Sequence, residues 1–384
     1  MQRLLVVTQV ALALVAVISA GLFARSFQAA RRINPDFDPS NVLVSHLSLN
    51  GYSVLERKQF VERLRDRLLS QPGVTAVTYA QTVPLGFAGQ WWEPLEIQGY
   101  VPGPGENMKI IRNVVAPGYF NLLRIPLVEG RDFTDHDDEK SAPVMIVSQA
   151  FARRFFGDGY PIGQHVQGWG QWFDVVGVAK DSKYETLNEA VKPYFYVPFR
   201  QVYREDMAIR LYVRTAGYPQ QMVEPVRRAV RSLDPEAGVF DAMPLAENIN
   251  AALFTEKLAA TMLAVLGAVA LLLAALGLYG VMAYAVAERR HEIGIRIALG
   301  ARPGDVVGMV VTQGMVLTLI GLAVGMVAAV AVTRLAAAVL VQVSATDPLV
   351  FAGALLFLAA VAALASYLPA RLAAGIDPNQ ALRS

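Results

Sequence analysis

Four long runs without a charged residue constrain this chain more than any other feature. They contain 21, 30, 28 and 23 residues and cover positions 4–24, 258–287, 306–333 and 348–370. About 20 helical residues cross the hydrocarbon core of a bilayer, so each run is long enough to form a transmembrane helix. The sequence therefore predicts an α-helical membrane protein with four spans.

The first and second runs raise separate questions. Residues 4–24 could be a cleaved signal peptide, but the run exceeds a usual signal core and Ile18-Ser19-Ala20 is a poor cleavage site, so we expect a retained span. The second run reaches about 45 Å as a helix at about 1.5 Å per residue. We expect it to project beyond the membrane as a stalk.

The charged residues are concentrated between the first two spans. Of the 34 Lys and Arg residues 24 lie within positions 26–255, as do 26 of the 32 Asp and Glu residues. This segment therefore reads as a water-exposed domain of nearly balanced charge. The net charge of +2 is too small to suggest nucleic acid as a partner, and the absence of cysteine excludes disulfides and thiolate sites.

The loop at 288–304 indicates the orientation in the membrane. It carries Arg289, Arg290, Arg296 and Arg302, whereas 340–347 holds no Lys or Arg. By the positive-inside rule we place this loop and both termini in the cytoplasm and the segment 26–255 on the opposite side of the membrane. Arg25, Arg31 and Arg32, which follow the first span on its outer side, oppose this assignment.

Helix signals agree with the spans. Asp305 after Pro303 can cap the third span, and Asp347 before Pro348 can cap the fourth. Small-residue pairs that permit close helix approach occur at Gly321/Gly325 and Gly277/Gly280. They fit either ordinary packing within the bundle or a dedicated dimer face.

The water-exposed segment predicts a mixed α+β domain. Positions 42–49 favour a strand, 56–70 a helix and 74–83 an extended segment, and this order returns at 208–214, 219–233 and 239–243. Such an internal repeat is typical of a split βαβ sandwich. Between the copies we expect a mainly β insert at about 84–204, with a strand at 172–181 and a short helix that Ser148 caps.

Motifs of catalysis and metal binding are missing from the sequence. There is no GxxxxGK[ST] phosphate loop, no GxSxG and no HExxH, and the four histidines are scattered. The acidic stretch 135–139 lacks the central Gly and distal Glu of a calcium loop, so a charged surface turn is the better interpretation. We expect no catalytic site, metal or cofactor. Trp91 and Trp92 fit either an exposed contact or the core of the insert.

The Arg-rich loop also carries a helical pattern. Glu292 and Arg296 form an i,i+4 pair, and Ile293 and Ile297 share one face while Ile295 and Leu299 lie on nearly the opposite face. The same residues alternate like a strand. A helix between the spans and another protein fits this pattern, as does a helix held at the membrane surface by headgroups, and spacing alone leaves these alternatives open.

Five stretches resemble the MacB/FtsX-type permeases of ABC transporters. ERRHEIGIRIALGARPGDVV resembles the family's loop signature, and LPARLAAGIDPNQALR resembles its ending. YFNLLRIPLVEGRDFTDHD, PVMIVSQAFARRFFGDGYPIGQHV and FDVVGVAKD are similar to the MacB-type periplasmic core domain. The resemblance implies a coupling helix that docks on a cytoplasmic ATPase, with the residues Glu288, Arg289, Arg290, Glu292, Ile293, Gly294, Ile295, Arg296, Ala298, Leu299 and Gly300.

The resemblance covers nearly the whole chain. It implies that the chain divides into a first span at 1–25, a periplasmic core domain at 26–255 and an FtsX-type membrane domain at 256–384. The chain is similar to the second half of duplicated permeases, and it begins almost at the first span, so a truncated or split unit is one expectation. It would pair with a copy of itself or a related half, with a separate ATPase, with the lipid bilayer and, in some members, with a periplasmic adaptor.

The resemblance further implies a multi-pass protein of the bacterial inner (cytoplasmic) membrane with both termini in the cytoplasm. It also implies mechanotransmission, in which ATP-driven motion reaches the periplasmic domain. We expect export of a drug-like, peptide or lipid-linked substrate. The alternatives are a regulatory permease that controls an extracytoplasmic enzyme, an inactive half-permease, and a membrane-anchored binding domain without an ATPase.

Overall fold

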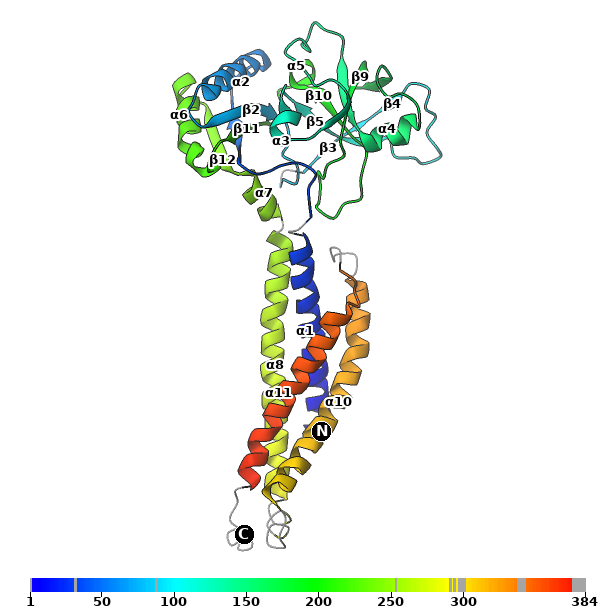
Figure 1. Cartoon of the computed structure of the whole chain (residues 1–384), viewed down its shortest axis with the longest axis vertical. Coiled ribbons are helices and arrows are strands. Elements are labelled where there is room, and N and C mark those ends of the chain that lie inside the picture. The colour runs from blue at the N-terminus through cyan, green and yellow to red at the C-terminus, as the bar shows by residue number, and fades with distance from the viewer. Residues whose placement is uncertain are drawn as a thin grey trace. The chain divides into compact units, whose positions relative to one another are not determined.

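The structure is a computed structural model that describes residues 2–30, 33–86, 89–252, 254–289, 292, 295, 302–336 and 343–374. The chain forms two compact units (Figure 1). One, here the helical unit, comprises Met1–Arg32 and Leu253–Ser384. The other, here the α/β unit, is Ile33–Ala252.

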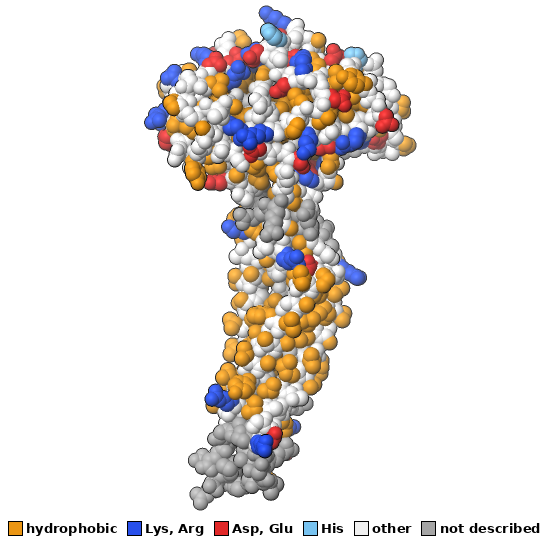
Figure 2. All heavy atoms as spheres, in the orientation of Figure 1, with side chains coloured by type: hydrophobic (Ala, Val, Ile, Leu, Met, Phe, Trp, Pro, Cys, Tyr) orange, Lys and Arg blue, Asp and Glu red, His pale blue; other side chains and the backbone are white. Residues whose placement is uncertain are grey.

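The helical unit contains the four expected membrane-length helices. They are α1 (Gln2–Ala30), α8 (Phe254–Glu288), α10 (Pro303–Leu335) and α11 (Pro348–Ala374), and each has the length and hydropathy to cross a bilayer. On the face drawn in Figure 2, hydrophobic side chains cover the middle of this bundle, whereas both signs of charge are mixed over the α/β unit. The predicted fold class, four spans and a mixed α/β domain, is confirmed.

Glycines allow α1 to pack closely against α10. A Cβ added at Gly321 would lie 2.8 Å from Val10 Cβ, and one at Gly325 would lie 2.9 Å from Ala11 Cα and from the Ala11 carbonyl oxygen. On α8, a Cβ at Gly277 would collide with the side chain of Gln9. These three glycines therefore serve packing within the chain, in line with the first of the two alternatives.

Four antiparallel strands and two helices form the repeated part of the α/β unit. The first copy is β1 (Val42–Ser48), α2 (Val54–Leu69) and β2 (Val74–Ala80). The second is β11 (Ile209–Thr215), α6 (Val223–Leu233) and β12 (Gly238–Pro244), with a 3-10 turn at Pro219–Met222 before α6. The strand order β12-β1-β11-β2 interleaves the copies, as a split βαβ sandwich requires. Helix α7 (Leu245–Ala252) follows β12.

Helix α2 begins two residues earlier than the sequence predicts, because Ser53 caps it. The Ser53 side chain accepts a hydrogen bond from the Glu56 N–H, and the Glu56 carboxylate accepts one from the Ser53 N–H at 2.8 Å. This reciprocal capping box satisfies two backbone donors that a helix start leaves open.

The insert between the two copies extends the same sheet. Its order continues from β2 through β5, β10, β7, β9 and β8 to β4, and β3 and β6 pair beside this path. Three short helices accompany these strands. The bounds are β3 (Trp91–Pro94), β4 (Glu96–Ile97), β5 (Lys109–Val115), α3 (Tyr119–Leu123), β6 (Leu127–Gly130), β7 (Val144–Ser148), α4 (Gln149–Phe156), β8 (His165–Gly168), β9 (Gln171–Ala179), β10 (Tyr194–Pro198) and α5 (Phe199–Val202).

The structure shows why two residues of the insert, Ser148 and Gly130, suit their positions. Ser148 caps α4 as expected, accepting a hydrogen bond of 3.2 Å from the Phe151 N–H. Gly130 has a φ of 73°, and a Cβ there would lie 2.1 Å from the Val176 carbonyl oxygen on β9. Only glycine fits this approach of β6 to β9.

A buried arginine joins three separate segments of the α/β unit. The Arg214 guanidinium on β11 donates to the Leu122 carbonyl at 2.6 Å, to the Ser40 carbonyl at 3.0 Å, and to both the carboxylate and the carbonyl of Asp38. Burial alone would raise the pKa of Asp38, but hydrogen bonds from Ser40 and the charge of Arg214 outweigh it and lower the pKa. The cluster fixes the segment that leads into β1.

The acidic stretch 135–139 is a structured turn. Asp137 is buried and accepts two hydrogen bonds of 2.8 Å from Arg131. Burial alone would raise the pKa of Asp137, yet the bonds from Arg131 and Thr134 lower it. Asp135 lies apart from Asp137, 3.5 Å from Arg65, so these carboxylates serve separate ion pairs.

Trp91 and Trp92 do not belong to the core of the insert. Their side chains are 46% and 43% exposed on β3, which pairs only with β5 among the described residues. The Arg112 guanidinium lies 6.0 Å from the Trp91 ring, so one tryptophan shields a buried cation. The core alternative for this pair is wrong.

Candidate functional site

The predicted coupling loop connects two well-defined helix ends. Helix α8 ends at Glu288, and the Arg289 N–H donates to the Val286 carbonyl at 3.2 Å. Helix α10 starts at Pro303, and the Asp305 carboxylate accepts a hydrogen bond of 3.1 Å from the Arg302 N–H. Both ends lie at the same end of the bundle as the end of α11 (Figure 1). The predicted Asp305 cap is therefore present.

Four of the predicted site residues lie within the described part of the chain. Glu288 and Arg289 are exposed at the end of α8, and Glu292 and Ile295 have helical backbone and exposed side chains, with Ile295 41% exposed. Exposed charges together with an exposed isoleucine fit either of the two alternatives, a protein partner or the headgroup region of a membrane. The other predicted residues lie outside the described residues: Arg290, Ile293, Gly294, Arg296, Ala298, Leu299 and Gly300.

At the other end of the bundle, Asp347 performs two tasks. Its carboxylate accepts hydrogen bonds from the N–H groups of Leu349 at 3.0 Å and Val350 at 3.3 Å, which caps α11 as predicted. It also forms an ion pair of 2.6 Å with Arg25 on α1. Of the three arginines that oppose the assigned orientation, Arg25 is thus paired within the chain, and Arg31 and Arg32 lie outside the described residues.

This ion pair was missed from the sequence, although a signal existed. Arg25 ends the first apolar run and Asp347 precedes the fourth, so a four-span topology places both at the same membrane surface. Opposite charges at one surface of a bundle are natural partners, and such a pair reduces the cost of charge near lipid.

The middle of each of the four membrane-length helices α1, α8, α10 and α11 carries no charged side chain. In the described spans the charges lie toward the ends, such as Arg25 on α1, Arg334 on α10 and Arg371 on α11. The buried polar groups inside are small: Thr318 donates to the Gly314 carbonyl at 2.9 Å, and Ser366 packs against Gly314. Within the described residues the bundle therefore lacks the charged lining of an ion pathway.

The described part of the chain contains no candidate metal-binding cluster. No group of three or more His, Asp or Glu side chains lies close enough to hold a metal ion there. His165 illustrates the point, because its ring bonds to Asp174 alone, at 2.6 Å, in an exposed pair.

The fold and the charge pattern define an integral membrane protein with a large α/β domain in water and a charged loop on its membrane bundle. Residues 4–233 match the family model of the MacB-like periplasmic core domain, and residues 264–378 match that of the FtsX-like permease C-terminal region. The chain belongs to the MacB/FtsX-type family of ABC transporter permeases.

Curated relatives agree with this family. The uncharacterized ABC transporter permease YknZ of Bacillus subtilis is 30% identical over 71% of this chain and 69% of its own length. The pyoverdine export ATP-binding/permease protein PvdT of Pseudomonas syringae is 29% identical over 78% of this chain and 45% of its length. The macrolide export ATP-binding/permease protein MacB of Nitrosomonas europaea is 30% identical over 67% and 40%. The chain thus spans less than half the length of the last two.

Solved structures of similar domains exist as well. The periplasmic region of MacB from Actinobacillus actinomycetemcomitans matches with a TM-score of 0.38 and 16% identity, covering 56% of this chain and 94% of that domain. The extracellular domain of YknZ matches with a TM-score of 0.34 and 19% identity, covering 52% of this chain and all of that domain.

Proposed function

We propose that this chain is the permease subunit of an ABC-type exporter in a bacterial inner membrane. Both termini and the 288–304 loop face the cytoplasm, and the α/β unit faces the periplasm. A separate ATPase docks on the loop, and its cycle moves the periplasmic unit. The observation that carries this proposal is the Arg-rich sequence of the loop, with helical backbone and exposed side chains at Glu292 and Ile295, at one end of a bundle whose described spans carry no charge at their middles.

The length of α8 supports a mechanical role. Its 35 residues extend about 52 Å at about 1.5 Å per residue, well beyond a hydrocarbon core of about 30 Å. The helix leads directly to Glu288 at the start of the loop. Displacement of the loop can therefore reach the other end of α8 without passing through a flexible joint within 254–288.

Residue 253, which lies between α7 and α8 in the sequence, is outside the described residues. Motion transfer from the helical unit to the α/β unit is part of the proposal. It requires that ATPase closure favours one of two arrangements of the bundle, because coupling between sites is a difference in free energy between states.

A second permease half is the proposed partner in the membrane. Helix α8 buries a smaller share of its surface in the bundle than the other three spans do. Large side chains such as Leu266, Leu272 and Leu276 are exposed on it. Contact with a copy of this chain or a related half would cover that surface, and lipid covers the remainder. A periplasmic adaptor would complete the assembly.

Export is favoured over regulation of an extracytoplasmic enzyme because of the large insert. The eight strands β3–β10 enlarge the α/β unit far beyond the four-stranded repeat. This surface can receive cargo or an adaptor. The substrate class we propose is drug-like, peptide or lipid-linked.

Co-purification tests the docking loop. The tagged full-length chain is extracted from native membranes in mild detergent, and bound proteins are identified by mass spectrometry. We expect an ABC ATPase with the wild type, and its loss in Glu292→Arg and Ile295→Asp, because one reverses a charge and the other removes an apolar contact on the exposed loop. Glu236→Arg, an exposed charge reversal in the α/β unit, is the matched control.

The outcomes separate clearly. Retention of the ATPase by the control and loss by both loop variants, with normal membrane insertion, supports docking at 288–304. An ATPase retained by all variants places the docking surface elsewhere. If the wild type captures no ATPase, the permease proposal fails.

A further inference from the structure

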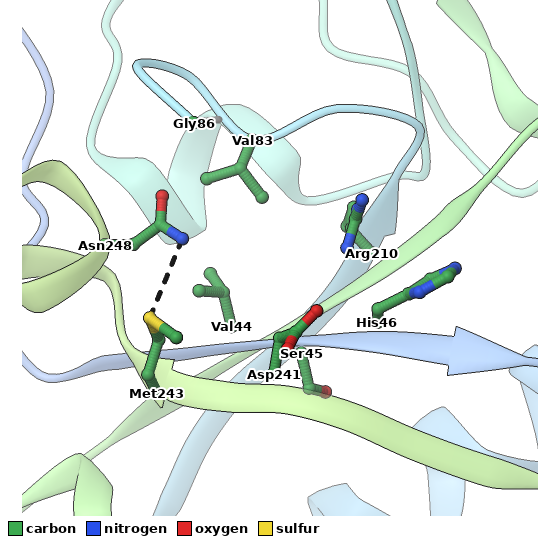
Figure 3. A pocket seen from close by; sticks show the side chains of 9 residues that line it. All are labelled: Val44, Ser45, His46, Val83, Gly86, Arg210, Asp241, Met243 and Asn248. Atoms are coloured by element: carbon green, nitrogen blue, oxygen red, sulfur yellow. Dashed lines mark hydrogen bonds between the residues drawn. The ribbon is translucent and has the colours of Figure 1, made fainter. Parts of the chain in front are cut away.

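A pocket of about 390 Å3 opens in the α/β unit where its first and last strands meet (Figure 3). Strands β1, β11 and β12 supply its floor, the loop after β2 one wall, and α7 another. The pocket is lined by Val44, Ser45, His46, Val83, Gly86, Arg210, Asp241, Met243 and Asn248. Its volume is within the range of small-molecule sites.

A β-bulge shapes this pocket. Val44 pairs with Met243 and His46 with Phe240, so β12 places two residues opposite the single residue Ser45. Asp241 lies in this bulge with a φ of 51°, a left-handed conformation that is unusual for a residue other than glycine. Bulges of this kind redirect side chains, often beside functional sites. Here Asp241 lines the pocket (Figure 3).

Two opposite charges share the pocket without pairing. Arg210 lies beside His46 in the β1–β11 register, and Asp241 is across the pocket floor on β12. Among the described residues none forms an ion pair or side-chain hydrogen bond with either. The Arg210 Nε atom is buried and has no partner. A native fold rarely leaves a buried charged donor open unless something else satisfies it.

A second polar group in the pocket is also open. The Asn248 Oδ1 atom is buried without a hydrogen-bond partner, and the Asn248 amide nitrogen reaches only Met243 Sδ, at 3.8 Å. Burial, and then the charge of Arg210, lower the pKa of His46, while Asp241 opposes this shift. Neutral His46 can donate with one ring nitrogen and accept with the other.

We propose that this pocket binds a small zwitterion with an apolar body, such as a short hydrophobic peptide with free ends. The ligand carboxylate pairs with Arg210, its ammonium group pairs with Asp241, and its apolar part lies on Val44, Val83 and Met243. A plain anion would meet the carboxylate of Asp241, and a plain cation would meet Arg210. A molecule that carries both charges satisfies both side chains at once.

The proposal goes beyond the permease function and does not depend on ATPase docking. All nine lining residues belong to the α/β unit, so the ligand can bind in the absence of nucleotide and ATPase. Failure of the docking experiment would leave this inference standing, and failure of ligand binding would leave docking standing.

Calorimetric titration of the full-length chain in detergent micelles tests the pocket. The probes are leucyl-leucine, its C-terminal amide and its N-acetyl form, each up to millimolar concentration. We expect the wild type to bind leucyl-leucine about tenfold or more tightly than either blocked form, because each blocked form loses one charged hydrogen-bonding pair.

Variants assign each end of the ligand. Arg210→Gln should weaken leucyl-leucine about tenfold and remove the preference over the amide, and Asp241→Asn should do the same for the acetyl form. Arg204→Gln is the control, because Arg204 is exposed and pairs with Asp206 at 3.7 Å outside the pocket. Far-UV circular dichroism and thermal unfolding verify that each variant is folded.

Several results would overturn the inference. One is a wild type that binds none of the three probes at millimolar concentration. Another is equal affinity for free and blocked peptides, which reveals an apolar groove without charge recognition. A third is a loss of binding in Arg204→Gln equal to that in Arg210→Gln.

Discussion

The substitution Gly325→Ala tests whether α1 and α10 are held together by direct backbone approach. The new Cβ would lie 2.9 Å from both the Cα and the carbonyl oxygen of Ala11, and 3.2 Å from Leu14 Cβ. Two of these atoms belong to the backbone of α1, so no change of rotamer can relieve the contact. The helices must move apart.

The size of the effect follows from these distances. Carbon atoms pack at about 3.5 Å or more, so α1 must move by about 0.6 Å along a buried interface. Overpacking of this kind costs about 1–3 kcal/mol. Alanine gains up to about 1 kcal/mol over glycine from helix propensity, which offsets part of the cost. We expect a net loss of about 1–2 kcal/mol.

The assay is SDS-induced unfolding in mixed micelles, followed by circular dichroism. Gly308→Ala is the matched control, because Gly308 lies on the same helix and a Cβ there meets nothing within 4 Å. The control should equal the wild type or exceed it slightly. A Gly325→Ala variant as stable as the Gly308→Ala variant would refute the packing, and would return the glycine pair to the role of a dimer face.

Two further predictions concern the α/β unit. Arg214→Gln removes the bonds to Asp38, Ser40 and Leu122 and leaves Asp38 with only the exposed Arg124, 3.1 Å away, as a cation, so thermal unfolding should show a loss of about 2–4 kcal/mol; a loss below about 1 kcal/mol would contradict the structural role of the cluster. For Asp137 the folded pKa lies below the unfolded value, so its ionised form stabilises the fold fully above about pH 4 and less as the pH falls through that value toward the folded pKa. The stability difference between the wild type and Asp137→Asn should therefore shrink below about pH 4 in urea titrations, and a difference independent of pH would exclude this contribution.

The sequence predicted elements correctly where the hydrophobic pattern and the helix-capping residues agree. Charge-free runs of more than 20 residues have few alternatives to spans, and the caps could be predicted because Asp347 directly precedes a proline and Asp305 follows one by two residues. The split βαβ order followed from a repeated strand-helix-strand pattern. In each case the signal is local, within a few residues of the element that it predicts.

The features missed from the sequence depend on contacts between distant residues. Arg25 pairs with Asp347, which lies 322 positions later in the sequence. The pocket brings together β1, near the start of the α/β unit's sequence, and β12 and α7, near its end. The bulge at Asp241 is a departure from regular pairing that alternation cannot reveal. The sequence left the burial of Trp91 open, because burial of an aromatic residue depends on which sheet face is covered, and periodicity does not specify this.

The central claim, that the 288–304 loop couples an ATPase to this permease, is tested most directly by ATP hydrolysis in a reconstituted system. The full-length chain and the ATPase that co-purifies with it are placed together in lipid nanodiscs, and the hydrolysis rate is compared between wild type and Glu292→Arg. The account predicts that the wild type stimulates the ATPase and that Glu292→Arg returns the rate to that of the ATPase alone. Equal stimulation by both proteins would contradict it.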